Sequence, residues 1–147
     1  MHAQENLDLK GTACVPVRTV EEDELAFQAG ERMDFVLHYR WGAINSDVGS
    51  ATVTLDNVTY DGQEAFLCHA HGRTSKFFDI FFKVREDFKS WFTRDGLKPL
   101  KFTRDTHEGG YEARNTFIYR WAEKTPYIDA DVYSSSSGQR NPDLPLT

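Results

Sequence analysis

Apolar and polar side chains alternate along most of this chain. A first alternating run places Met33, Phe35, Leu37, Tyr39 and Trp41 on one side. The same period recurs at 50–56, 64–72, 84–92, 100–104, 111–121 and 127–133. Because successive side chains of a β-strand point to opposite faces of its sheet, this pattern predicts half-buried strands. Asp-Gly and Gly-Gly pairs between the runs suit tight turns, so we expect hairpins and an antiparallel sheet.

The period changes around residues 76–82. Four phenylalanines, Phe77, Phe78, Phe81 and Phe82, recur at a spacing that gathers their rings on one helical face. We therefore expect a short helix there, capped by Thr74 or Ser75, that packs its rings onto an open end of the sheet. The predicted fold class is mostly β: an antiparallel, barrel-like or open half-barrel sheet with one short Phe-rich helix.

The chain has 147 residues, which fits one domain. Residues 1–24 show no sustained period and are predicted to be a flexible N-terminal arm. Residues 25–133 form the antiparallel β domain. Residues 134–147 are rich in Ser, Gly and Pro and read as a flexible connector, which suggests a truncated form of a longer protein.

Charge and composition exclude several classes of partner. The net charge of −6 disfavours nucleic acid, because that affinity comes chiefly from neutralising phosphates. No apolar run approaches the roughly 20 residues of a transmembrane helix. Met1 to Glu5 resemble the residues that follow a signal-peptidase site, so we expect an exported, periplasmic or cell-envelope protein whose signal peptide has been removed.

Metal and cofactor chemistry find little support in the sequence. Cys14 and Cys68 lack zinc-site spacing, and whether they form a disulfide is left open. His69 and His71 share a strand face but have no evident third ligand, and the turn around His107 lacks the second histidine of a zinc protease. We therefore expect no metal and no cofactor.

Two groups of residues are candidates for a functional site. The first is a basic and aromatic stretch suited to a ligand or a surface: Arg73, Lys76, Phe77, Phe78, Phe81, Lys83 and Arg85. The second is a pair of carboxylates, Asp87 and Glu108, which could approach each other in a barrel and hydrolyse a glycoside. Nucleophile motifs and phosphate-binding glycine patterns are absent, so no catalytic residue is assigned and a non-enzymatic role is favoured.

Four ordered blocks together resemble the bacterial exported family called domain of unknown function 3108. They are Phe27 to Arg32, Gly72 to Thr74 with the phenylalanines that follow, Lys83 to Ser90, and Glu108 to Tyr111. The resemblance implies an envelope protein with a β-rich, barrel-like fold and no established activity. It supplies no catalytic residues. Its members are usually longer than this chain.

These observations lead to three alternative functions. The leading prediction is a non-enzymatic binding module whose concave β surface takes an apolar or amphipathic molecule, because the chain is rich in aromatic residues and poor in catalytic motifs. The second is a carbohydrate-processing hydrolase that uses Asp87 or Glu108. The third is a peripheral membrane-contact module formed by residues 73–85. The ligand and the oligomeric state are not determined by the sequence.

Overall fold

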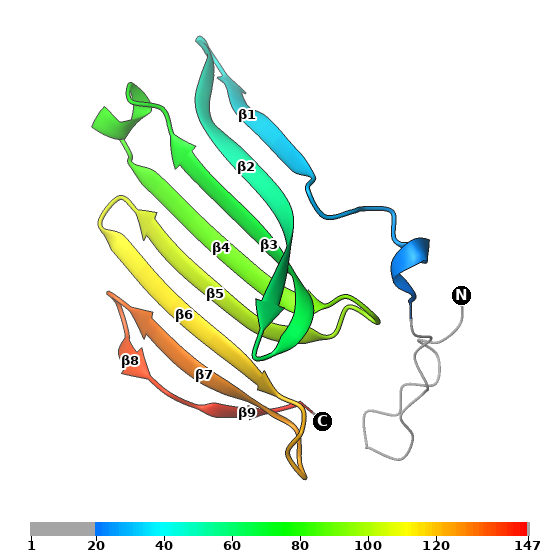
Figure 1. The fold of residues 1–147 in the computed structure, drawn as a ribbon. Helices are drawn as coiled ribbons and strands as arrows, with labels where there is room; N and C mark the ends of the chain where they lie inside the picture. Colours follow the sequence, from blue (N-terminus) through cyan, green and yellow to red (C-terminus); the bar gives the residue numbers. More distant parts are fainter. Residues whose placement is uncertain (1–19, 147) are drawn as a thin grey trace, which may run out of the picture.

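The computed structural model describes residues 20–146, so the expectations about Met1 to Glu5 and about Cys14 lie outside the described residues. Figure 1 shows one twisted layer of antiparallel strands that lie side by side in chain order. The strands are β1 (Arg32–Trp41), β2 (Ile44–Tyr60), β3 (Gln63–Thr74), β4 (Val84–Thr93), β5 (Pro99–Glu108), β6 (Tyr111–Arg120), β7 (Tyr127–Ser134), β8 (Gly138–Arg140) and β9 (Asp143–Pro145). Two 3-10 turns, η1 (Glu22–Glu24) and η2 (Phe78–Ile80), complete the elements.

Short connections produce this simple topology. Asp61 and Gly62 link β2 to β3 with positive φ angles of 49° and 78°, as the favoured two-residue hairpin turns require. Each strand therefore pairs with the strand that follows it, from β1 through β8, and β9 also pairs with β7. Alternate connections fall at the same end of the sheet. The predicted antiparallel sheet is confirmed.

The sheet remains open and does not close into a barrel. Within residues 20–146, β1 forms one edge, and the other edge is shared by β8 and β9. The barrel-like alternative is therefore wrong, and the open form is the correct one. No hydrogen-bonded pairing joins the two edges among the described strands.

The strand register separates an apolar face from a polar face. Paired residues such as Val53, Ala70 and Phe88 lie on the same side, because directly opposed residues of neighbouring strands share a face. We call this side the apolar face. It also carries Met33, Phe35, Leu37, Ala51, Leu55, Phe66, Cys68, Phe92, Phe102 and Phe117. The opposite side, the polar face, carries Thr52, His69, His71, Asp87, Asp105 and Arg114.

Residues 20–31 cover part of the apolar face. The Phe27 ring meets the Phe66 ring edge-on at 5.9 Å, and Phe66 is 1 % exposed. Backbone bonds between this segment and Leu55 tie it to β2. Glu22 accepts a hydrogen bond of 2.9 Å from Nε of Arg94, so one residue of the predicted arm fastens it to the β4–β5 connection. Its acidic residues 21–24 are exposed, as a solvated lead-in would be.

The predicted Phe-rich helix is wrong, because η2 is a single 3-10 turn and the described residues contain no α-helix. Residues 75–83 reverse the chain between two paired strands, and within them only Phe78–Ile80 form a helical turn. Most of the ring surface does not pack onto the sheet end either: Phe77, Phe81 and Phe82 are 63 %, 72 % and 56 % exposed, and Phe78 is half-buried. Neither Thr74 nor Ser75 makes a side-chain capping bond to the turn.

The C-terminal residues also differ from the expected connector. Within residues 134–146, β8 and β9 both pair antiparallel with β7. Ile128 is paired with Leu144, and Tyr133 is paired with Gln139. The Ser-rich and Pro-rich composition therefore accommodates two short strands rather than an unpaired segment.

A β-bulge makes Gly49 the most constrained glycine of the sheet. Leu37 pairs with Gly49 and His38 pairs with Asp47, so Val48 is the extra residue on β2. A Cβ added at Gly49 would lie 2.4 Å from the carbonyl oxygen of Arg73, which belongs to the rigid backbone of β3. A Cβ added at Gly72, by contrast, would make ordinary contacts at 3.7 Å or more.

We expect Gly49→Ala to destabilise the fold by about 1–3 kcal/mol, because the backbone of β2 or β3 must shift to relieve the overlap. Gly72→Ala is the matched control and should change stability little. Urea unfolding of both variants measures the difference. Equal stability of the two would show that the bulge adjusts without cost.

Candidate functional site

Two groups of rings lie on the apolar face, and together we call them the ring band. Phe66 and Phe92 lie 5.6 Å apart, Phe88 and Phe102 lie 6.4 Å apart, and the Phe102 and Phe117 rings stack at 6.0 Å. The rings of Phe88, Phe102 and Phe117 are half-buried although no second layer covers them among the described residues. The band therefore presents aromatic surface from β3 to β6.

A cavity of about 380 Å³ opens beside this band, under Phe27. Its apolar walls come from Met33, Val53, Leu55 and Phe92, and the polar side chain of Glu31 lies at its border. Cys68 also lines it, and burial raises the pKa of this thiol, so that the side chain stays protonated and behaves as an apolar wall. The volume falls within the range typical of small-molecule sites, roughly 300–1,000 Å³.

Four polar residues interrupt the apolar face next to the ring band. They are Glu86 on β4, Arg104 and Thr106 on β5, and Asn115 on β6, and we call them the polar cluster. Glu86 is paired with Thr106, and Arg104 is paired with Asn115, so all four share the face. The Thr106 hydroxyl donates to Oε2 of Glu86 at 2.7 Å and accepts from Nε of Arg104 at 2.7 Å. Thr106 itself is fully buried.

The bonds within the polar cluster leave several groups unused. Oε1 of Glu86 and Oδ1 of Asn115 are buried without a hydrogen-bond partner among the described residues. In the same part of the chain, Arg104 bonds to Thr106 through Nε, and its terminal guanidinium nitrogens have no acceptor but are not among the buried unpaired atoms, so they reach the surface. The two buried oxygens are acceptors whose burial without a partner costs free energy, whereas the accessible nitrogens of Arg104 are donors that suit an acceptor from outside.

The ionisation of Glu86 is shifted toward the neutral acid. Burial raises the pKa of Glu86 most, and the neighbouring Glu108 carboxyl raises it further. The hydrogen bond from Thr106 and the charge of Arg104 act in the opposite direction. Glu86 and Glu108 both lie on the apolar face. A proton on Glu86 removes the repulsion between their two negative charges.

The two carboxylates predicted from the sequence do not meet. Asp87 lies on the polar face, paired with Asp105, and its Oδ2 is 2.6 Å from Nε2 of His69. Glu108 is paired with Val84 and lies beside Glu86 on the apolar face. The sequence reasoning missed Glu86, although its place in the same alternating phase as Phe88 marks it as a charge among apolar residues.

No group of three metal-binding side chains occurs among residues 20–146. His71, Asp87, Asp105 and His107 line a polar recess of about 360 Å³. Nε2 of His107 lies 3.0 Å from Oδ1 of Asp105. No helix in this part of the chain is long and apolar enough to cross a membrane.

Comparison with protein families identifies the chain. The model of the family described as "Protein of unknown function (DUF3108)" matches residues 34–143. The chain belongs to this family. The matched residues include the ring band and the whole polar cluster, so both are part of the DUF3108 region. Comparisons with curated proteins and with solved structures found no match.

The basic and aromatic residues predicted as contacts all lie at one end of this DUF3108 sheet. Arg73 on β3 and Arg85 on β4 are paired and lie on the polar face. Lys76, Phe77, Phe78, Phe81 and Lys83 belong to the β3–β4 connection. Lys76, Lys83 and Arg73 are exposed, whereas Phe78 and Arg85 are half-buried.

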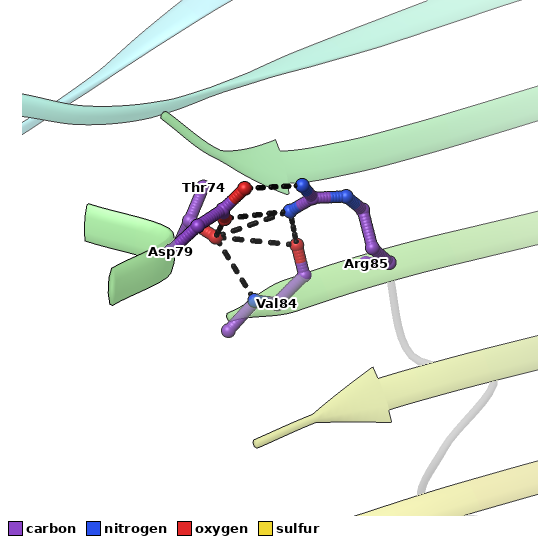
Figure 2. A network of polar contacts seen from close by, with 4 residues as sticks. All are labelled: Thr74, Asp79, Val84 and Arg85. Atoms are coloured by element: carbon purple, nitrogen blue, oxygen red, sulfur yellow. Dashed lines mark hydrogen bonds and ion pairs between the residues drawn. The ribbon is translucent and has the colours of Figure 1, made fainter. Parts of the chain in front are cut away.

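Arg85 is engaged in a network that holds the β3–β4 connection against the sheet (Figure 2). Its guanidinium donates to both carboxylate oxygens of Asp79, at 2.5 and 2.9 Å, and to the carbonyl oxygen of Val84 at 2.6 Å. The Thr74 hydroxyl donates to Asp79 at 2.5 Å and accepts from the Val84 amide at 2.9 Å. Arg85 is thus neutralised by Asp79 and is not available to a ligand.

The first prediction from this site concerns Glu86. Because its folded-state pKa is raised, neutral Glu86 contributes stability that is complete below the ordinary value of 4.5 and is lost as the pH rises through the folded value. Glu86→Gln keeps an acceptor for Thr106 but cannot ionise. We expect this variant to melt at a higher temperature than the parent at pH 7 and at the same temperature near pH 4.

Thermal melts of both proteins at the two pH values measure this effect. Glu123→Gln, which neutralises an exposed glutamate of the β6–β7 connection, is the control and should change neither melting temperature. A gain for Glu86→Gln that is equal at both pH values would assign the effect to packing rather than to ionisation.

The second prediction concerns Asp79. Its hydrogen bonds with Arg85 and Thr74 hold the pKa of this carboxyl well below its ordinary value of 3.8. Its contribution to stability is therefore complete above 3.8 and is lost as the pH falls through the folded value. We expect Asp79→Asn to lower the melting temperature at pH 7. The difference in melting temperature between the variant and the parent should become smaller as the pH falls below 3.8. Asp56→Asn, at an exposed position of β2, should have no such effect.

Proposed function

We propose that this DUF3108 protein binds a single-chain amphiphile with an anionic head group on its apolar face and that it has no catalytic activity. We further propose that it acts in the periplasm or cell envelope, as the residues at its N-terminus predict. The observation that carries the binding proposal is Arg104, a half-buried arginine set in an aromatic surface, with no acceptor for its terminal nitrogens among the described residues.

The apolar part of the ligand would supply most of the affinity. Burial of a hydrocarbon chain contributes about 0.8 kcal/mol per methylene before the entropy costs of binding are subtracted. The ring band and the cavity beside it offer apolar surface for such a chain. Ser90, which lines the cavity, is paired with Phe102, and Phe102 lies two residues before Arg104 on β5. One chain could therefore extend from the cavity to the polar cluster.

The polar cluster would hold the head group. A guanidinium binds a carboxylate or a phosphate through two parallel hydrogen bonds, which a half-buried site strengthens. Nε of Arg104 donates a hydrogen bond to the Thr106 hydroxyl, which fixes the orientation of the guanidinium. Ionised Glu86 would repel an anion, and because its pKa is raised, the neutral acid, which can donate a hydrogen bond, forms at a higher pH than for an ordinary glutamate.

The hydrolase alternative is not proposed. Hydrolysis of a glycoside needs two carboxyl groups on either side of one bond. Asp87 and Glu108 lie on opposite faces of the sheet, and Asp87 is bonded to His69. Asp87 and Glu108 therefore cannot act together on one glycosidic bond.

The test compares ligands that differ in their head group alone. Decanoate, decanol and decylamine are titrated against the full chain while they displace the neutral fluorophore N-phenyl-1-naphthylamine. We expect decanoate to bind most tightly. Arg104→Gln should weaken decanoate binding by roughly tenfold or more, because a charged hydrogen bond is lost, and should leave decanol binding unchanged.

Arg114→Gln is the matched control. Arg114 lies on β6, the strand next to that of Arg104, but on the polar face. Its guanidinium stacks over the Tyr133 ring at 4.8 Å. This variant should bind all three ligands as the parent does. Tighter binding of decylamine than of decanoate would contradict the proposed head group. Failure of all three to displace the fluorophore would contradict the binding function as a whole.

A further inference from the structure

Exposed apolar side chains gather at one end of the sheet. The connections β1–β2, β3–β4, β5–β6 and β7–β8 all lie there, because every strand reverses direction (Figure 1). The exposed large apolar residues at this end, which we call the aromatic end, are Trp41, Ile44, Phe77, Ile80, Phe81, Phe82 and Tyr111. Ile80 is 78 % exposed, Phe81 is 72 % exposed and Trp41 is 70 % exposed.

The other end of the sheet has a different surface. The connections β2–β3, β4–β5 and β6–β7 lie there, and none of the described residues in them is a large apolar side chain that is exposed. Tyr60 and Trp121, which border these connections, are half-buried, and Nε1 of Trp121 donates to the carbonyl oxygen of Pro99 at 2.6 Å. Exposed rings therefore distinguish the aromatic end from the opposite end, although the edge strand β1 also carries exposed apolar side chains, among them Phe35 and Tyr39 at 47 % each.

The β3–β4 connection holds its exposed rings in place. The Asp79–Arg85 network fixes it at its base, and Phe77 meets Phe78 and Phe81 edge-on at 5.4 and 5.7 Å. Phe82 lies over Gly109 of the β5–β6 connection, where an added Cβ would be 2.7 Å from its ring. A preorganised tip loses little conformational entropy when it is buried in a contact.

Positive charge surrounds the same rings. Arg73, Lys76 and Lys83 are exposed around the tip, while Asp79 is already neutralised by Arg85. The acidic residues nearby include Glu108 and Glu112 at the neighbouring connection, where Glu112 lies 3.5 Å from His107. On the other side lies Asp47, next to Val48, whose carbonyl oxygen accepts from the Ser75 amide; Asp47 is 2.7 Å from Nδ1 of His38. The net charge of the whole chain is −6, so a basic surface at the tip runs against the overall balance.

We propose that the aromatic end docks onto the surface of an anionic lipid bilayer, a role beyond the proposed ligand binding. Aromatic rings at the tip would enter the interfacial region, and the lysines would pair with acidic head groups. This orientation brings the polar cluster near the bilayer, because Glu86 is the third residue of β4 at that end. An amphiphile could then pass between the membrane and the apolar face without crossing bulk water.

The experiment measures co-sedimentation of the full chain with vesicles. Vesicles of phosphatidylglycerol and phosphatidylcholine should bind the protein, and vesicles of phosphatidylcholine alone should bind it weakly. We expect Lys76→Glu with Lys83→Glu to reduce binding to anionic vesicles by roughly tenfold or more, because each lysine near an anionic surface contributes to binding. Higher salt should reduce parent binding in the same direction.

Two further variants separate the causes. Lys98→Glu with Lys124→Glu makes the same charge change at exposed positions of the opposite end, and it should leave vesicle binding near the parent level. Ile80→Ser with Phe81→Ser removes two exposed apolar side chains, keeps the fold, and should reduce binding even at fixed charge. Decanoate affinity, measured as above, should be unchanged in the variants of the tip, so that this proposal and the ligand proposal fail separately.

Equal loss of binding in the two lysine pairs would show a nonspecific charge effect and would overturn the proposal. Failure of the parent to bind either kind of vesicle would also overturn the proposal, and the exposed rings would then point to a protein partner instead. Unchanged binding after Ile80→Ser with Phe81→Ser would exclude insertion of the tip.

Discussion

Backbone pairing between consecutive strands is the constraint on which the rest of this structure depends. The described chain forms one layer, and its fully buried apolar side chains are few, with Phe66 the largest. A sheet without a second layer gains less from packing, so its register must be held by the hydrogen-bond ladder and by contacts across neighbouring strands. The ring pairs of the apolar face and the contact of Phe27 with Phe66 provide such contacts. A slip by one residue would exchange the two faces.

The same pairing places the candidate site. Glu86, Arg104 and Asn115 come from three strands, and the register alone brings them to one face. Their surroundings then determine their chemistry, because burial and the neighbouring Glu108 favour the neutral form of Glu86, while Thr106 orients Arg104. The meander also gathers alternate connections at one end, and in this way the exposed rings and lysines of the β3–β4 connection lie near the site. Ligand binding and membrane contact are thus proposed for adjacent parts of one surface.

Much of the fold could be read from the alternation of residues, including the strands from Met33 to Trp41 and from Tyr127 to Tyr133. The helix prediction failed because the spacing of the four phenylalanines places their rings on one side only if the chain stays helical throughout residues 77–82. Here the helical turn η2 ends at Ile80. The pairing of Arg85, one of the predicted contact residues, depends likewise on the fold of this connection. Its partner Asp79 is six residues away in the sequence and reaches it through the turn.

The sequence by itself determined the strand pattern, the antiparallel pairing and the family, because these follow from local alternation, turn residues and ordered motifs. Only the tertiary structure decided that the sheet stays open, that Asp87 and Glu108 lie on opposite faces, and that Glu86 lies beside Glu108. The physical reason is register. Alternation shows that two residues of one strand share a face, but which residues of different strands meet depends on how connections and bulges align the strands, as the extra residue Val48 illustrates.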